Sequence, residues 1–151
     1  MPAHVWPRAR RAFYNDCVAP RHFTREEAES LIPRLAELVL QLQERKHVYD
    51  HHETKVAELT TKMRGNGHML DGDLKEAQAG LERTAAEVNG LAEQVHDMGC
   101  ELKGIEEGLI DFRAEMDGRE IYLCWKLGED SIAWWHELDT GFGGRRPLEE
   151  R

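Results

Sequence analysis

The sequence predicts an α+β fold, in which a long antiparallel helical hairpin is followed by a small antiparallel β meander packed on the base of the first helix. Two observations lead to this prediction. Apolar residues recur at spacings of three and four from Ala28 to Met98, and they alternate with polar residues on both sides of Asp117-Gly118. The first period is typical of helices that share a coiled-coil seam, and the second of strands joined by a tight turn.

The composition indicates one soluble domain with a modest core. The chain has 151 residues, of which 40% are hydrophobic and 32% are charged. A formal net charge of −9 argues against bulk nucleic-acid binding and against binding to anionic membranes. Three cysteines without a C-x-x-C spacing, and the lack of an apolar run of membrane-spanning length, lead us to expect a cytoplasmic protein with reduced thiols.

We expect a flexible N-terminal extension at residues 1–21 and a single domain at residues 22–148. The extension has no hydrophobic period and carries three prolines and four arginines. Alternatively, its three aromatic residues anchor it on a partner or on the domain itself. The domain divides into a helical hairpin at 24–98 and a β lobe at 100–140, and a C-terminal loop covers 141–151.

The first helix is predicted to begin at Thr24, which serves as its N-cap, with Glu27 completing a capping box. Pro33 is expected to kink this helix near its first turns or to split off a short leading helix. The glycines of Gly65-Asn-Gly-His68 end it. Folding a second helix back about residues 65–72 pairs Met63 with Leu74, Val56 with Leu81, Tyr49 with Val88 and Leu42 with Val95, and places His52 near Thr84 and Ala85.

The first helix is predicted to overhang the second. At about 1.5 Å per residue, the two helices are roughly 60 Å and roughly 40 Å long. The apolar face of the overhang is too broad for a single seam, so the β lobe is expected to cover it. This face consists of Leu31, Ile32, Leu35, Leu38, Val39 and Leu42.

The β lobe is organised around Asp117-Gly118, which predicts a two-residue hairpin turn. The turn sets a register that separates an apolar face from a polar face, and a slip of one residue would exchange the two. The apolar face pairs Ala114 with Ile121, Phe112 with Leu123 and Ile110 with Trp125, and the polar face pairs Arg113 with Tyr122 and Asp111 with Cys124.

A second tight turn is expected with Glu129-Asp130 at its tip, which returns the chain as a strand over Ser131–Asp139. A helix over 131–139 is the alternative, and a strand at about Glu101–Ile105 adds a fourth to the meander. In the expected register, Trp125 meets Trp134, Leu123 meets His136 and Ile121 meets Leu138 on the apolar face, while Cys124 meets Trp135 and Tyr122 meets Glu137 on the polar face.

Motifs spread along the chain resemble an uncharacterised bacterial and archaeal family, domain of unknown function twenty-two-zero-three. They are F-T-x-E-E-A at 23–28, R-x-N-G-H at 64–68 and L-C-W-x-L-G-E at 123–129, followed by W-H-E-L-D-x-G-F-x-G-R at 135–145. The resemblance covers about Arg21 to Leu148 and implies no particular activity. It implies that the family signature includes Asp111, Trp125, Glu129, His136, Glu137 and Arg145.

Polar residues of the lobe form two candidate sites. The first is a binding site for a small anionic ligand, bordered by the loop Gly141–Arg146, whose backbone N–H and guanidinium groups suit an anion. The second is a divalent-metal or acid/base cluster, because carboxylate and imidazole groups suit such ions. The binding candidates are Asp111, Arg113, Tyr122, Trp135, Glu137 and Arg145, and the metal candidates are Asp111, His136, Glu137 and Asp139.

The expected register works against the metal cluster. It places His136 on the apolar face and Asp111 with Glu137 on the polar face, although a different turn or a helix at 131–139 removes this objection. The alternative interpretation is a hydrogen-bonded core histidine with an ion pair between Arg113 and Glu137. Cys124 has no base beside it in sequence, so a catalytic thiol is not expected.

The helical hairpin carries two further groups. His47 and His51 stand at i, i+4 on one helix face, a spacing that chelates metals or simply faces solvent. A hairpin with an acidic tip and a small lobe is also similar to the transcript-cleavage factors that enter the secondary channel of RNA polymerase, in which tip acids hold magnesium. The tip residues here are His68, Asp71 and Asp73.

These patterns favour a non-catalytic binding or interaction module, with a rigid helical arm and a small polar-aromatic site on the lobe. Its expected partner is another protein or a second copy of the chain, bound through the helical hairpin. One alternative is a metal-dependent, hydrolase-like enzyme that uses Asp111, His136, Glu137 and Asp139. The other is a polymerase secondary-channel factor that uses the acidic tip.

Overall fold

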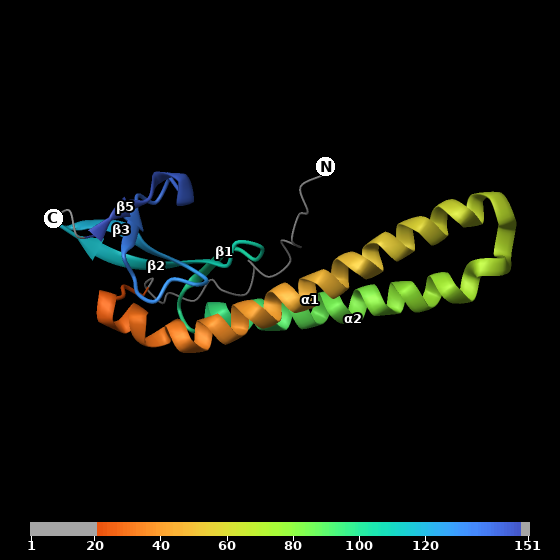
Figure 1. Cartoon of the computed structure of the whole chain (residues 1–151), viewed down its shortest axis with the longest axis horizontal. Helices are drawn as coiled ribbons and strands as arrows, with labels where there is room; N and C mark the ends of the chain where they lie inside the picture. Colours follow the sequence, from red (N-terminus) through yellow and green to blue (C-terminus); the bar gives the residue numbers. More distant parts are fainter. Residues whose placement is uncertain (1–20, 149–151) are drawn as a thin grey trace.

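The computed structural model describes residues 21–148, and the expectations for residues 1–20 and 149–151 lie outside them, as do the side chains of residues 66–68. Two long helices lead into a five-stranded antiparallel sheet of order β1-β2-β3-β4-β5 (Figure 1), so the predicted α+β fold is confirmed. The elements are α1 (Arg25–Asn66), η2 (Gly67–Leu70), α2 (Asp71–Asp97), β1 (Glu101–Gly104), β2 (Leu109–Met116), β3 (Arg119–Lys126), β4 (Trp134–His136), η3 (Phe142–Gly144) and β5 (Arg146–Pro147).

The capping box predicted at the start of α1 is present. The N–H of Glu27 donates to Oγ1 of Thr24 at 3.1 Å, and the N–H of Thr24 donates to Oε2 of Glu27 at 3.0 Å. α1 continues through Pro33 as one helix, so the alternative prediction of a separate leading helix is wrong. Figure 1 shows the first turns of α1 at an angle to the rest, as expected for a helix with an interior proline.

α1 and α2 form the predicted antiparallel hairpin, joined at the tip by the single 3₁₀ turn η2. The ring of His52, expected near Thr84 and Ala85, lies against Gly80, one helical turn earlier on α2. Gly80 has no side chain, and this leaves the space that the imidazole fills. Neither helix within residues 21–148 combines the length and apolar character that a membrane-spanning segment requires.

The overhanging part of α1 covers the apolar face of the sheet, as predicted. Leu35, Leu38 and Leu42 are at most 1% exposed, and they share one core with Phe112 and Trp125. Hydrogen bonds tie both ends of this region to the lobe. The N–H of Phe23 donates to the carbonyl of Arg113 at 2.8 Å, and Nε2 of Gln43 donates to the carbonyls of Ile105 and Glu106 at 3.1 and 3.0 Å.

The register of β2 on β3 is the predicted one, from Ile110 opposite Trp125 to Glu115 opposite Glu120. The turn between the strands explains why it is fixed. Asp117 and Gly118 have φ values of 52° and 77°, the positive values that a two-residue turn of this kind requires. β1 pairs with β2 near the place expected for a fourth strand.

The register of β4 on β3 differs by one residue from the prediction. His136 lies opposite Tyr122, Trp135 opposite Leu123 and Trp134 opposite Cys124. β4 is also short: it ends at His136, and Leu138, expected in the core opposite Ile121, is 43% exposed. Neither the long strand over 131–139 nor a helix there is formed.

The connection between β3 and β4 explains the shift. It covers residues 127–133 and is not a two-residue turn at Glu129-Asp130. Ile132 within it is fully buried in the core, and its N–H donates to Oε1 of Glu29 on α1 at 3.1 Å. Because this anchor fixes where the returning chain starts, every side chain of β4 changes face relative to the expectation.

Gly80→Ala is expected to lower the free energy of unfolding, although alanine favours a helix over glycine by up to about 1 kcal/mol. A Cβ at Gly80 would lie 2.5 Å from Cε1 of His52, so the ring would have to move. Gly90→Ala in the same helix is the matched control. A Cβ there meets nothing within 4 Å, and we expect this variant to be more stable than wild type in chemical denaturation.

His52→Ala provides the second control, since it removes the ring that the new methyl group would meet. In this background Gly80→Ala is expected to stabilise the hairpin as Gly90→Ala does. Equal stabilisation by Gly80→Ala and Gly90→Ala in the wild-type background would contradict the close contact between His52 and Gly80.

Candidate functional site

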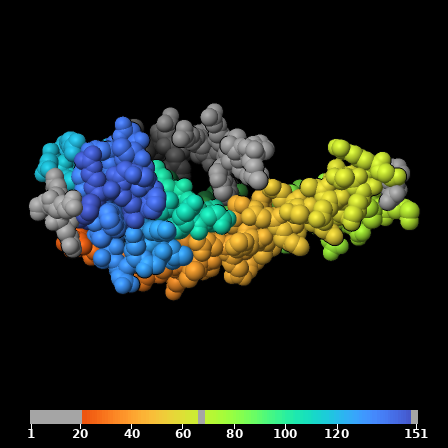
Figure 2. Space-filling view, turned by 45° about the horizontal axis from the view of Figure 1, so that its top comes forward, coloured from red at the N-terminus to blue at the C-terminus, as the bar shows by residue number. Residues whose placement is uncertain are grey.

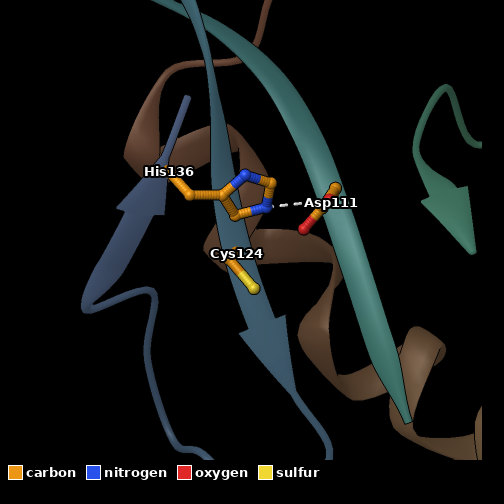
Figure 3. A group of neighbouring side chains, drawn as sticks. All are labelled: Asp111, Cys124 and His136. Atoms are coloured by element: carbon orange, nitrogen blue, oxygen red, sulfur yellow. Dashed lines mark hydrogen bonds and ion pairs between the residues drawn. The ribbon is translucent and has the colours of Figure 1, made fainter. Parts of the chain in front are cut away.

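The candidate site lies on the polar face of the sheet, turned away from α1. Asp111 of β2, Cys124 of β3 and His136 of β4 come from three neighbouring strands and point toward one another (Figure 3). Their exposed fractions are 2%, 1% and 2%, and the neighbouring Tyr122 is 4% exposed. Buried polar groups are costly unless they are hydrogen-bonded, so the partners of these side chains decide what the site can do.

His136 is held from both sides. Its Nε2 lies 3.0 Å from Oδ2 of Asp111, and its Nδ1 lies 2.7 Å from the carbonyl oxygen of Glu137. Both neighbours are hydrogen-bond acceptors, so at least one proton must lie between the imidazole and the Asp111 carboxylate. The ring also packs on Tyr122 in a tilted arrangement, with centroids 5.4 Å apart.

Cys124 completes the cluster. One potential ligand atom from each of Asp111, Cys124 and His136 lies within 4.8 Å of the other two, and no other such group occurs among the described residues. Burial raises the pKa of the Cys124 thiol to about 12, the nearby Asp111 carboxylate adds to this effect, and Arg145 opposes it. At neutral pH the sulfur is therefore a thiol, which is a weak nucleophile.

Arg145 and Glu129 border the cluster as a two-bond ion pair. Nη1 and Nη2 of Arg145 donate to the two carboxylate oxygens of Glu129 at 2.9 and 2.7 Å, and Nη2 also donates to the carbonyl of Cys124 at 3.2 Å. The guanidinium stacks on the rings of Trp134 and Phe142, 5.1 and 4.9 Å from their centroids. Its Nε is buried and has no hydrogen-bond partner.

Glu129 also holds the connection after β3. Its Oε2 accepts from the N–H of Lys126 at 2.8 Å, and its carbonyl accepts from Nε1 of Trp125 at 2.8 Å. The pair therefore joins the end of β3 to the segment just before β5 in one planar arrangement. The guanidinium of Arg145, which was expected to bind an anion, therefore already has the Glu129 carboxylate as its partner.

A second charged group covers Tyr122. The guanidinium of Arg113 and the ammonium of Lys103 lie 5.4 and 4.7 Å from the centroid of its ring. Arg113 forms ion pairs with Glu120 at 3.1 Å and with Glu101 at 3.4 Å. Burial raises the pKa of Tyr122 to about 12, and a hydrogen bond to Glu101 contributes.

The structure brings together only part of each predicted set. Asp111 and His136 meet, but Glu137 pairs with Arg119 at 3.2 Å and Asp139 is exposed. The ion pair expected between Arg113 and Glu137 is therefore wrong. Trp135, expected on the polar face, lies on the apolar face and is buried in the core. The binding candidates that do share the polar face or its border are Asp111, Arg113, Tyr122 and Arg145.

Sequence reasoning placed Cys124 opposite Asp111, as the structure does, but did not include it among the site candidates. It missed Trp134 as a neighbour of the site, because in the slipped register His136 and Trp134 point into the core. No local signal in the sequence gives the correct register. Ile132 and Trp135, three residues apart, both point into the core, so the two-residue period is broken between them and His136 lies on the face of Asp111.

The groups on the hairpin remain separate from the lobe. His47 and His51 are both exposed on α1. At the tip, Asp73 is exposed, Asp71 is half-buried at the start of α2, and the side chain of His68 lies outside the described residues.

The chain belongs to a family described as an uncharacterized conserved protein, DUF2203, which it matches over residues 21–148. The resemblance inferred from the motifs is thereby confirmed, and the match begins where the expected N-terminal extension ends. No curated protein and no solved structure matches the chain.

Arg145→Ala is expected to lower the free energy of unfolding by about 2 kcal/mol, because it leaves the Glu129 carboxylate without its partner and uncovers two aromatic rings. Arg145→Lys is expected to recover less than half of the loss, since an ammonium group cannot form the two parallel bonds. Arg146→Ala, at an exposed neighbour, is the control and should cost under about 1 kcal/mol in thermal or chemical denaturation. Equal losses for the two alanine variants would contradict the assigned role of the pair.

Cys100 and Cys124 are expected to be unreactive toward a thiol reagent at pH 8. Burial raises the pKa of each thiol to about 12, so the thiolate is scarce and the reagent lacks access. In a Cys17→Ser variant the native protein should show no fast-reacting thiol, and the unfolded protein should show both. Fast labelling of Cys124 in the native state would contradict this account of the polar face.

Proposed function

We propose that this member of the DUF2203 family is a non-catalytic interaction module, and that its helical arm binds a second copy of the chain. The helical arm is the part of the hairpin beyond the lobe, residues 46–90. It projects from the lobe as a pair of helices with no third layer on it among the described residues (Figures 1 and 2). This projection is the observation that carries the proposal.

The packing within the arm supports a partner. Where the sheet covers α1, Leu35, Leu38 and Leu42 are at most 1% exposed. In the arm, only two helices face each other. Each helix shields only one side of its neighbour, so most seam residues are only half-buried. The larger half-buried apolar residues of the two long helices in the arm are Val48, Tyr49, Val56, Met63, Leu74 and Leu81. Helices with such seams commonly complete their burial in four-helix bundles.

The charges of the arm favour a second copy as that partner. Residues 46–66 of α1 carry four basic and three acidic side chains, a net charge of +1, whereas residues 71–90 of α2 carry two basic and five acidic, a net charge of −3. Two arms related by a twofold axis can therefore place α1 of each copy against α2 of the other with opposite charges in contact.

The chemistry of the polar face supports a role other than catalysis. Asp111 and His136 bond to each other, the adjacent thiol is neutral, and Arg145 is taken up by Glu129. The alternative of a metal-dependent hydrolase draws on Glu137 and Asp139, which lie outside the cluster. The alternative of a polymerase factor draws on Asp71 and Asp73 at the tip, and a test of binding to core polymerase addresses it directly.

Sedimentation equilibrium tests the proposal with charge-reversal variants. Lys55 and Lys62 are exposed on α1, and Glu76 and Glu82 are exposed on α2. We expect the wild-type chain to dimerise, and Lys55→Glu with Lys62→Glu to weaken the dimer by about tenfold or more at low salt. Mixing this variant with Glu76→Lys and Glu82→Lys should restore association as a heterodimer.

Circular dichroism is the control, because the helical content of both variants should equal that of wild type. A wild-type chain that stays monomeric at all concentrations would overturn the proposal. A dimer dissociation constant that is unchanged by both charge reversals would show that the arms do not form the interface.

A further inference from the structure

We propose that Asp111, Cys124 and His136 bind one zinc-class divalent ion, which fastens β2, β3 and β4 together. This inference is independent of the helical arm. It rests on three side chains from three adjacent strands whose potential ligand atoms already lie within 4.8 Å of one another. Carboxylate, thiolate and imidazole are the ligand types that structural and catalytic zinc sites use.

The distances fit a small rearrangement. Zinc–ligand bonds are about 2.0 to 2.3 Å long, so ligands of one ion stand about 3 to 4 Å apart. Nε2 of His136 and Oδ2 of Asp111 are 3.0 Å apart already, and the sulfur of Cys124 lies within reach of both. Shifts of about 1 Å by side chains that point toward one another are enough to enclose an ion, and a water molecule is a suitable fourth ligand.

His136 is oriented as metal-binding histidines usually are. Its Nδ1 lies 2.7 Å from the carbonyl oxygen of Glu137, so that nitrogen serves as a hydrogen-bond donor. The bond fixes the tautomer and the ring orientation, and leaves Nε2 to face Asp111 and Cys124.

The charge of the cluster also suits a divalent cation. A carboxylate, a thiolate and a neutral imidazole carry a total charge of −2, which one divalent ion reduces to zero. Burial penalises net charge, so a neutral metal site avoids the main cost of placing an ion in the lobe.

Arg145 adds support from the side of the sulfur. Its Nη2 donates to the carbonyl of Cys124 at 3.2 Å, and its buried Nε has no hydrogen-bond partner. A metal-bound thiolate is a better acceptor than a thiol for this N–H group. The positive charge of Arg145 is balanced by Glu129 at 2.7 Å, so the surroundings of the cluster stay neutral as well.

Cobalt substitution of the full-length protein tests the proposal. We expect the purified chain to bind one equivalent of Zn²⁺ or Co²⁺ by elemental analysis. The Co²⁺ form should show the visible bands of a four-coordinate ion and a near-ultraviolet band from sulfur-to-cobalt charge transfer. Zn²⁺ should raise the melting temperature of chelator-treated protein, since the ion binds only the folded lobe.

Three variants separate this cluster from other sites. Cys124→Ser should abolish the charge-transfer band, whereas Cys100→Ser, at a buried cysteine outside the cluster, should retain it. His47→Ala with His51→Ala, which removes the exposed histidine pair of α1, should leave both the stoichiometry and the band unchanged. His136→Gln is the second test at the cluster, should Cys124→Ser fold poorly.

The opposite results overturn the proposal. A chelator-treated wild-type protein that gains no metal, no charge-transfer band and no thermal stability on adding Zn²⁺ or Co²⁺ would show that the cluster is a metal-free hydrogen-bonded pair beside a thiol. Metal binding that is lost with His47 and His51 but kept without Cys124 would place the ion on the surface of the helical arm.

Discussion

Leu35, Leu38 and Leu42 of α1 share one core with Phe112, Leu123 and Trp125 of the sheet, and the rest of the molecule is arranged around this contact. Each fully buried side chain of this size contributes about 1.5 to 3 kcal/mol, more than a single hydrogen bond of the lobe. Because α1 is far longer than the sheet it covers, its remainder projects as the helical arm. Because α1 covers one face of the sheet, the polar residues collect on the other.

The same contact decides what lies on the polar face. Ile132 enters the core beneath α1, and its N–H bonds to Glu29, so the chain returns to the sheet at a fixed position. Alternation along a strand then places His136 beside Asp111 and Trp135 in the core. A displacement of one residue would bury the imidazole of His136 among apolar side chains and separate it from Asp111 and Cys124. The arrangement of Asp111, Cys124 and His136 thus depends on the packing of Ile132, which is not one of the cluster residues.

Local signals made most of the fold predictable. The capping box at Thr24, the helical period of the hairpin and the turn at Asp117-Gly118 each act within a few residues, and the structure has all three. The register of β4 was not predictable in this way, since it depends on a contact between Ile132 and an element about a hundred residues away in sequence. For the same reason Asp111 and His136, 25 residues apart, were identified as candidates but assigned to opposite faces, and Cys124 was set aside.

The register of β4 is the central claim, and nuclear Overhauser contacts of the His136 ring test it most directly. The account predicts contacts between the ring protons of His136 and those of Tyr122, whose centroids are 5.4 Å apart, together with contacts between Trp135 and Leu123. Contacts between the His136 ring and the methyl groups of Leu123 would instead indicate the slipped register. That result would separate His136 from Asp111 and remove the basis of the cluster.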